Sequence, residues 1–253
     1  MKKEAFYNII NEMAPLSYAM PGDNSGIQIE TERSEIKKIL VSLDVTPDTV
    51  QEAAANKCDI ILTHHPLFFK KLGSILSDST ARIIRDLIRN DIGLVSFHTN
   101  FDVAADTWKN FFNLSDEQVI EPVLENRGIG LLGTLPHPET VASIAQRIKN
   151  FTKTQYLQYV GRDIERRVER IAFCSGSGMS LLQRVQTAGA ELFITGDVKY
   201  HDALYAYLNR LDILDAGHFG TEIVYKNEMK EKLSNYVEVI VSEKDINPFG
   251  VIL

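Results

Sequence analysis

The fold class is indicated by residues 59–69, DIILTHHPLFF, because they combine the pattern of a buried strand with a loop directly after it. The run Ile60–Thr63 is short, β-branched and apolar, which is typical of a strand inside a parallel sheet. Before it, Ile39–Leu43 predicts another strand, and Thr46-Pro47 predicts the start of the helix between them, with threonine as the cap and proline at the first helical position. Residues 39–63 therefore predict a strand–helix–strand unit, the building block of α/β folds.

The same order of elements continues and then returns in the second half of the chain. Apolar periodicity predicts helices over Lys3–Met13, Ser79–Asn90, Pro138–Phe151, Met179–Ala188 and His201–Leu208, and further strands over Gly93–Phe97, Arg170–Cys174, Glu191–Thr195 and Leu211–Asp215. We therefore predict two similar three-layer α/β lobes with mainly parallel sheets. The first is expected over residues 1–125 and the second over residues 126–253, with C-terminal elements able to pack back on the first.

Composition excludes several classes of protein. The chain has 253 residues, of which 44% are hydrophobic and 24% charged, the balance of a soluble globular protein. Its formal net charge of −7 disfavours nucleic acid as a partner, because binding to phosphates needs excess positive charge. Cys58 and Cys174 are too few for a disulfide framework and are expected to be buried, inert thiols. The N-terminal stretch has no uninterrupted apolar run, and no stretch is long enough to span a membrane, so we expect a cytoplasmic protein.

Four histidines stand where predicted strands end. His64 and His65 follow the strand at 60–63, His98 follows the strand at 93–97 in GLVSFHTNFD, and His218 follows the strand at 211–215 in LDAGHFGTE. The carboxyl ends of parallel strands are where ligands bind in α/β folds. A carboxylate stands four residues after His98 and after His218, at Asp102 and at Glu222, which places each pair on one face if the chain turns helical there.

These residue types predict a metal site. Imidazole nitrogens and carboxylate oxygens are ligands for Zn, Mn, Fe, Co or Ni. Three histidines and two carboxylates exceed what one tetrahedral ion needs and suit two divalent ions bridged by a carboxylate, with open positions for water. The side chains of His64 and His65 are expected to diverge on extended backbone, so that each serves a different ion.

Other candidates have weaker patterns. His137 is expected in a loop and has no assigned role, and His201 either contacts the site or caps a helix. The turn at Gly176–Gly178 could present N–H groups to an anion or simply connect a strand to a helix. Asp44 ends a strand and could orient a ligating imidazole, whereas Asp23 is placed in a turn.

The segments DNSGIQI (23–29), VSLDVT (41–46), DIILTHHPLFF (59–69), SFHTNFD (96–102), FITGDVKYHDAL (193–204) and LDAGHFGTE (214–222) occur in the order found in the Nif-three-like, YbgI-type proteins. The chain resembles this family over essentially its whole length, in the short form without an inserted domain. Many members carry the label "GTP cyclohydrolase 1 type 2 homolog".

The resemblance implies a two-lobed protomer in a toroidal homohexamer, with a dinuclear metal centre facing the internal cavity. The family's ligands correspond to His64, His65, Asp102, His218 and Glu222. His98 corresponds to a position beside them, where it either supports a ligand or contacts the substrate. We also expect His98 to be the candidate proton shuttle, because imidazole exchanges protons near neutral pH.

The resemblance does not identify a reaction. We expect metal-assisted hydrolysis of a small molecule, in which a water bridging the two ions attacks the substrate. The alternative is a non-catalytic metal-binding or interaction protein that forms a ring-shaped assembly. A ring that threads nucleic acid is disfavoured by the acidic composition.

Overall fold

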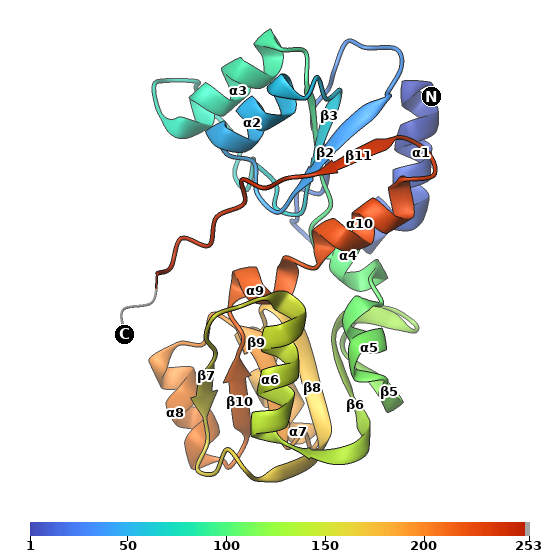
Figure 1. The fold of residues 1–253 in the computed structure, drawn as a ribbon. Coiled ribbons are helices and arrows are strands. Elements are labelled where there is room, and N and C mark those ends of the chain that lie inside the picture. The colour runs from blue at the N-terminus through green and yellow to red at the C-terminus, as the bar shows by residue number, and fades with distance from the viewer. Residues whose placement is uncertain (251–253) are drawn as a thin grey trace. The chain divides into compact units, whose positions relative to one another are not determined.

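The computed structural model describes residues 1–250, and the chain divides into two compact units. The first unit comprises Met1–Ala104 together with Tyr225–Pro248, and the second comprises Ala105–Val224 together with residues 249–250 of the described chain. Each unit is built on its own sheet (Figure 1). The chain therefore leaves the first unit, completes the second, and returns to the first with residues 225–248.

The first unit contains a five-stranded sheet in the order β1-β4-β3-β2-β11. Its strands are β1 (Gly26–Ile29), β2 (Lys38–Ser42), β3 (Ile60–Thr63), β4 (Gly93–Ser96) and β11 (Glu238–Val241). Its helices are α1 (Lys3–Met13), the short η1 (Leu16–Tyr18), α2 (Pro47–Ala55), α3 (Ser79–Arg89), α4 (Thr99–Ala104) and α10 (Tyr225–Leu233). Four strands are parallel, and β1 joins the edge of β4 antiparallel.

Side-chain alternation on these strands gives the first unit its layers. Leu40, Ile61 and Leu94 point to one face and pack with α2 and α3, which Figure 1 shows together on one side of the sheet. Their neighbours Ile39 and Val41 point to the other face, where α10 packs on β2 and β11. The three inner strands, β2, β3 and β4, are buried on both faces, which explains why their sequences are almost continuously apolar.

The second unit contains a six-stranded sheet in the order β5-β6-β8-β9-β10-β7. Its strands are β5 (Ser115–Leu124), β6 (Arg127–Thr140), β7 (Gln158–Val160), β8 (Arg167–Ser177), β9 (Leu192–Gly196) and β10 (Asp212–Asp215). Its helices are α5 (Thr107–Phe112), α6 (Val141–Thr152), the short η2 (Met179–Leu181), α7 (Leu182–Thr187), α8 (Tyr200–Leu208) and α9 (His218–Glu222).

The second unit is also three-layered, because β8 alternates between two cores. Ile171 and Phe173 pack with Trp108 of α5 and with α6, whereas Ala172 and Cys174 pack with α7 and α8 on the opposite face. Each large apolar side chain that is fully buried in these cores stabilises the fold by about 1.5–3 kcal/mol. The predicted two-lobe α/β fold is therefore confirmed.

Two details of the second unit differ from the prediction. The parallel strands β8, β9 and β10 are present, but the antiparallel pairs β5–β6, β6–β8 and β10–β7 make the sheet mixed. The helix predicted from Pro138 begins at Val141, because β6 continues to pair with β8 as far as Thr140. The Thr140 hydroxyl then caps the helix by accepting from the Ser143 N–H at 3.1 Å. His137 consequently lies in a strand and not in a loop.

Candidate metal centre

The candidate ligands of the first unit follow three adjacent parallel strands. In the sheet, β3 lies between β4 and β2, and all three run in the same direction. His64 and His65 follow the end of β3, His98 follows β4, and Asp44 follows β2. The strand ends therefore bring four polar side chains to one edge of the sheet, as the sequence predicts.

His64 is buried and held by the backbone of the neighbouring strand. Its Nδ1 donates to the carbonyl oxygen of Phe97 at 2.8 Å, and its side chain is 1% exposed. Because a carbonyl oxygen can only accept, the proton of the neutral ring sits on Nδ1 and the lone pair sits on Nε2. The ring packs against Phe101 and Tyr225, whose centroids lie 5.9 and 5.2 Å away. The packing and the hydrogen bond fix both the orientation and the tautomer of this histidine.

His65 is oriented by Asp44. Its Nδ1 lies 2.8 Å from the Asp44 carboxylate, so the ring presents Nε2, and Asp44 contacts a candidate ligand in the way that the sequence suggests. The expected divergence of His64 and His65 is not observed, since their ring centroids are only 5.0 Å apart. The strand ends at Thr63, and the chain bends there as the N–H groups of both histidines bond to Leu43, so the extended-backbone alternation no longer applies.

His98 is oriented by Asp23, a residue that the sequence pattern places only in a turn. The Asp23 carboxylate accepts from His98 Nδ1 and from the Ser25 hydroxyl, both at 2.8 Å, and also from the backbone and side chain of Thr99. Burial alone would raise the pKa of Asp23, but these hydrogen bonds outweigh it and hold the pKa well below its ordinary value. The antiparallel pairing of β1 with β4 brings Asp23 next to His98. No local pattern in the sequence predicts that pairing.

These three histidines converge. One ring nitrogen from each of His64, His65 and His98 lies within 4.8 Å of the other two. Each Nδ1 is already bonded to an oxygen, so an ion at this point would be bound through the Nε2 atoms. His98, which the sequence placed beside the ligands, thus lies within the cluster in the structure.

Asp102 belongs to the first turn of α4, which begins at Thr99, directly after His98. The N–H of Asp102 bonds to the carbonyl of His98 at 3.1 Å, so the chain is helical over this spacing of four. Its carboxylate lies 3.8 Å from His64 Nε2. The first unit therefore holds three imidazoles and one carboxylate of suitable chemistry.

In the second unit, His218 and Glu222 are the first and last residues of α9, which follows β10. Their spacing of four places His218 Nε2 3.0 Å from Glu222 Oε2. The other ring nitrogen, Nδ1, lies 2.7 Å from Asp197, which directly follows β9. The hydrogen bond to Glu222, helped by Asp197 and opposed by burial, raises the pKa of His218 to about 9. Asp197 holds His218 as Asp44 holds His65, and its place at a strand end was the available sequence signal.

The turn at Gly176–Gly178 leaves the space that the Glu222 side chain occupies. Gly176 has a φ of +58°, and a Cβ atom there would lie 2.2 Å from Glu222 Oε1. The N–H groups of Gly176 and Gly178 donate to the hydroxyls of Thr221 and Thr195, each at 2.9 Å. Of the two predicted roles for this turn, these bonds favour a tight connection over an anion site.

The remaining candidates belong to neither of these groups of possible ligands. His137 is exposed on β6, and His201 is exposed as the second residue of α8, where the N-terminal cap is Lys199. Cys58 and Cys174 are both buried, no disulfide joins them, and burial raises the pKa of Cys58 to about 11. The predicted burial of both thiols is confirmed.

Across residues 1–250, the structure contains no helix of the length and apolar character needed to cross a membrane.

Comparison with known proteins gives one consistent result. A "GTP cyclohydrolase 1 type 2 homolog" of Clostridium perfringens is 36% identical over 263 residues, and the alignment covers 100% of both chains. The crystal structure of a Staphylococcus aureus hypothetical protein is 26% identical and superposes with a TM-score of 0.88, over 100% of this chain and 99% of that one. A Bacillus cereus protein related to NIF3 shares the fold, with a TM-score of 0.87 at 21% identity and the same coverage.

The sequence pattern of one family, Duf34/NIF3 (NGG1p interacting factor 3), matches residues 1–248. Because that match spans nearly the whole chain, and the expected resemblance rested on the strand-end segments described above, the protein belongs to the Duf34/NIF3 family.

Proposed function

We propose that this protein binds two divalent metal ions per chain and is a metal-dependent hydrolase of a small molecule. The proposed ligands are His64, His65 and Asp102 from the first unit and His218 and Glu222 from the second. The observation that carries the proposal is the convergence of two of these ligands, His64 and His65, with His98: one ring nitrogen of each lies within 4.8 Å of the other two, and each Nδ1 is bonded to an oxygen. Histidines that serve only packing do not need this shared orientation, whereas metal ligands do.

The donor set fits Zn, Fe, Mn, Co or Ni, because it consists of imidazoles and carboxylates without thiolates. Such ions supply Lewis acidity and make water a better nucleophile at neutral pH. The chain's own residues do the positioning. Asp44 and Asp197 hold the protons on Nδ1 of His65 and His218, and Asp23 does the same for His98. His98, exposed enough to meet solvent, is the proposed proton carrier for the reaction.

Assembly and location are part of the same proposal. We propose a ring-shaped homohexamer that works in the cytoplasm on a small-molecule substrate, without nucleic acid or membrane as a partner. Family membership and the net charge of −7 support this set of expectations. Sedimentation equilibrium tests the oligomer directly, and a monomer or dimer at micromolar concentration would contradict it.

The proposal is tested by metal content per chain, measured by mass spectrometry on protein purified without chelator or a metal-binding tag. We expect about two transition-metal ions per chain. Asp102→Ala should lower this content, whereas His137→Ala should leave it unchanged, because His137 is exposed near the end of β6. Equal loss in both variants would contradict the ligand assignment, and a content near zero after reconstitution with Zn, Mn and Fe(II) would contradict the metal centre.

Hydrolysis requires a second measurement. The metal-loaded protein should turn over at least one member of a panel of hydrolase substrates, and chelation should abolish that turnover. Tightly held metal with no turnover, together with co-purifying partners, would instead favour a non-catalytic metal-binding protein.

A further inference from the structure

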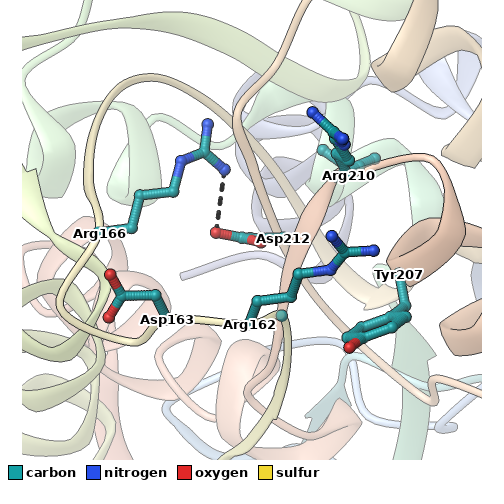
Figure 2. A pocket seen from close by; sticks show the side chains of 8 residues that line it. Arg162, Asp163, Arg166, Tyr207, Arg210 and Asp212 are labelled. Carbon is teal, nitrogen blue, oxygen red and sulfur yellow. Dashed lines mark hydrogen bonds and ion pairs between the residues drawn. The ribbon is translucent and has the colours of Figure 1, made fainter.

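The second unit contains a hollow of about 450 Å³ that none of the candidate metal ligands lines (Figure 2). It is formed by the segment between β7 and β8, by the C-terminal end of α8 and by the start of β10. The polar residues that line it are Arg162, Asp163, Arg166, Tyr207, Arg210 and Asp212.

The hollow and the candidate ligands of this unit lie at opposite ends of the sheet. Asp212 is the first residue of β10, and Asp215 is the last. His218 and Glu222 come after the carboxyl end of this strand, whereas the hollow opens at its amino end. A ligand in the hollow would therefore occupy a site separate from these two residues.

One of the three arginines has a structural role. Arg166 Nη1 lies 3.1 Å from Asp212 Oδ2, the contact drawn in Figure 2, and its Nη2 lies 3.3 Å from Glu191 Oε1. Burial raises the pKa of Asp212, and the charge of Arg166 opposes that rise. Two carboxylates therefore compensate Arg166, and its charge is not available to a ligand.

The other two arginines are placed differently. Within residues 1–250, neither Arg162 nor Arg210 forms a side-chain ion pair. The chain has more carboxylates than basic side chains, with a net charge of −7, yet in the described part of the chain none of these carboxylates pairs with either arginine. The remaining carboxylate, Asp163, accepts from the N–H of Glu165 at 3.0 Å and caps a turn. Asp163 keeps its negative charge, so the charged residues that line the hollow, three arginines and two aspartates, leave an excess of one positive charge, and the guanidinium groups of Arg162 and Arg210 have no carboxylate partner there.

Tyr207 fixes one of these guanidinium groups. The Arg162 guanidinium lies 4.9 Å from the centroid of the Tyr207 ring, and Figure 2 shows the two side chains together. A guanidinium held against an aromatic ring keeps its N–H donors in its own plane, free to point at a ligand beside the ring. Tyr207 is therefore a positioning residue for Arg162.

We propose that this hollow binds a small phosphate monoester, with Arg162 and Arg210 as the donors to the phosphate. Each guanidinium can donate two parallel N–H bonds, so two of them match the three acceptor oxygens of a phosphate monoester, whereas the two oxygens of a carboxylate need only one. The volume falls in the range of roughly 300–1,000 Å³ found for small-molecule sites, so it holds an organic group in addition to the phosphate.

The test is calorimetric titration of the full chain with phenyl phosphate, with benzoate as the carboxylate comparison. Both chelator-treated and metal-loaded protein are titrated, so that binding at a metal centre is separated from binding in the hollow. We expect one phenyl phosphate per chain in both preparations and an affinity at least about tenfold tighter than for benzoate. The affinity should also fall as NaCl rises from about 50 to 300 mM.

Two double variants make the test specific. Arg162→Gln with Arg210→Gln should weaken phenyl phosphate binding at least about tenfold. Arg82→Gln with Arg89→Gln removes two exposed arginines from α3 in the first unit, and this control should bind as the wild type does. Each pair changes the net charge by the same amount, from −7 to −9, so bulk charge cannot explain a difference.

Tyr207 supplies a further control. Tyr207→Phe keeps the ring and should keep the affinity, whereas Tyr207→Leu removes the ring and should weaken binding several-fold. The proposal is overturned if the wild type binds no phenyl phosphate, if benzoate binds equally well, or if both double variants lose the same affinity. Binding only to the metal-loaded protein would also overturn it, while leaving the proposed metal centre intact.

Discussion

At the scale of single residues, each histidine of the two clusters is held by an oxygen on its Nδ1 side. The acceptor is the Phe97 carbonyl for His64 and a carboxylate for each of the others. Three aspartates, Asp23, Asp44 and Asp197, therefore matter to the site without being candidate ligands. Their shared effect is to fix the tautomer of the neutral ring, so that a histidine that gives up its second proton has its lone pair on Nε2.

Removing one of these carboxylates should weaken metal binding without unfolding the chain. In Asp44→Ala, His65 loses the acceptor 2.8 Å from its Nδ1, and we expect metal affinity to fall about 10–100-fold. Asp48→Ala is the matched control, since Asp48 is an exposed aspartate at the start of the next helix. Competition with a fluorescent chelator measures both, and an unchanged affinity in Asp44→Ala would show that Asp44 does not orient a ligand.

A second residue-scale prediction concerns Gly176. Gly176→Ala places a Cβ atom 2.2 Å from Glu222 Oε1 at a φ of +58°, so Glu222 must move. Gly189→Ala has a similar φ of +78° and no atom within 4 Å of the new Cβ, so it measures the backbone cost alone. We expect a loss of about 1 kcal/mol in the free energy of unfolding for Gly189→Ala and a larger loss for Gly176→Ala.

Metal affinity separates the two glycine variants further. Because only Gly176→Ala displaces a candidate ligand, only this variant should lose metal. Urea denaturation and metal content measure the two effects independently. Equal stability and equal metal content in the two variants would mean that the position of Glu222 does not require the absence of a Cβ atom at Gly176.

At the scale of elements, β11 is attached to the first unit by more than its strand pairing. Asp245, which follows β11, accepts from the N–H of Leu43 at 2.7 Å and from the Ser42 hydroxyl at 2.9 Å. It also pairs with Lys226 of α10 at 2.7 Å, and its side chain is only 2% exposed. This one carboxylate therefore ties α10 and the end of β11 to the end of β2.

Asp245→Ala should destabilise the protein strongly. It leaves the Leu43 N–H and the half-buried Lys226 ammonium without their carboxylate, and we expect a loss of about 3 kcal/mol in the free energy of unfolding. Glu243→Ala removes an exposed carboxylate two residues earlier and should change stability by less than about 0.5 kcal/mol. Similar midpoints of chemical denaturation for the two variants would contradict this role of Asp245.

At the scale of the whole molecule, the two units differ in how the chain builds them. The helices and strands of the second unit all lie within residues 105–224, whereas the first unit needs residues 225–248 for α10 and β11. The first unit therefore cannot be complete until the second has been synthesised.

Truncation after Val224 should unfold the first unit and leave the second unit folded. We expect the first unit to lose its fold, because β2 would become an exposed edge and the face covered by α10 would be uncovered. The second unit should stay protected, since all its strands remain. Hydrogen exchange with fragment analysis measures both units, and a chain ending at Pro248 is the control. Protection of β2 in the chain that ends at Val224 would contradict the expectation.

The sequence by itself determined the elements and most of the chemistry of the site. Apolar runs and the helix-capping residues Thr46-Pro47 are local patterns, and they placed the strands that end before His64, His98 and His218 within a few residues. The spacing of four between His218 and Glu222 likewise became one helical turn with a 3.0 Å contact. Such features could be predicted because they depend on neighbours in the chain.

Only the tertiary structure decided the features that depend on distant pairing. Asp23 reaches His98 because β1 pairs antiparallel with β4, and residues 238–241 belong to the first sheet because β11 pairs with β2. The second sheet is mixed for the same reason, since β5, β6 and β7 find antiparallel partners. Hydrogen bonds between strands join backbone groups that every residue carries, so the choice of partner is set by packing of the whole unit and leaves little trace in the local sequence.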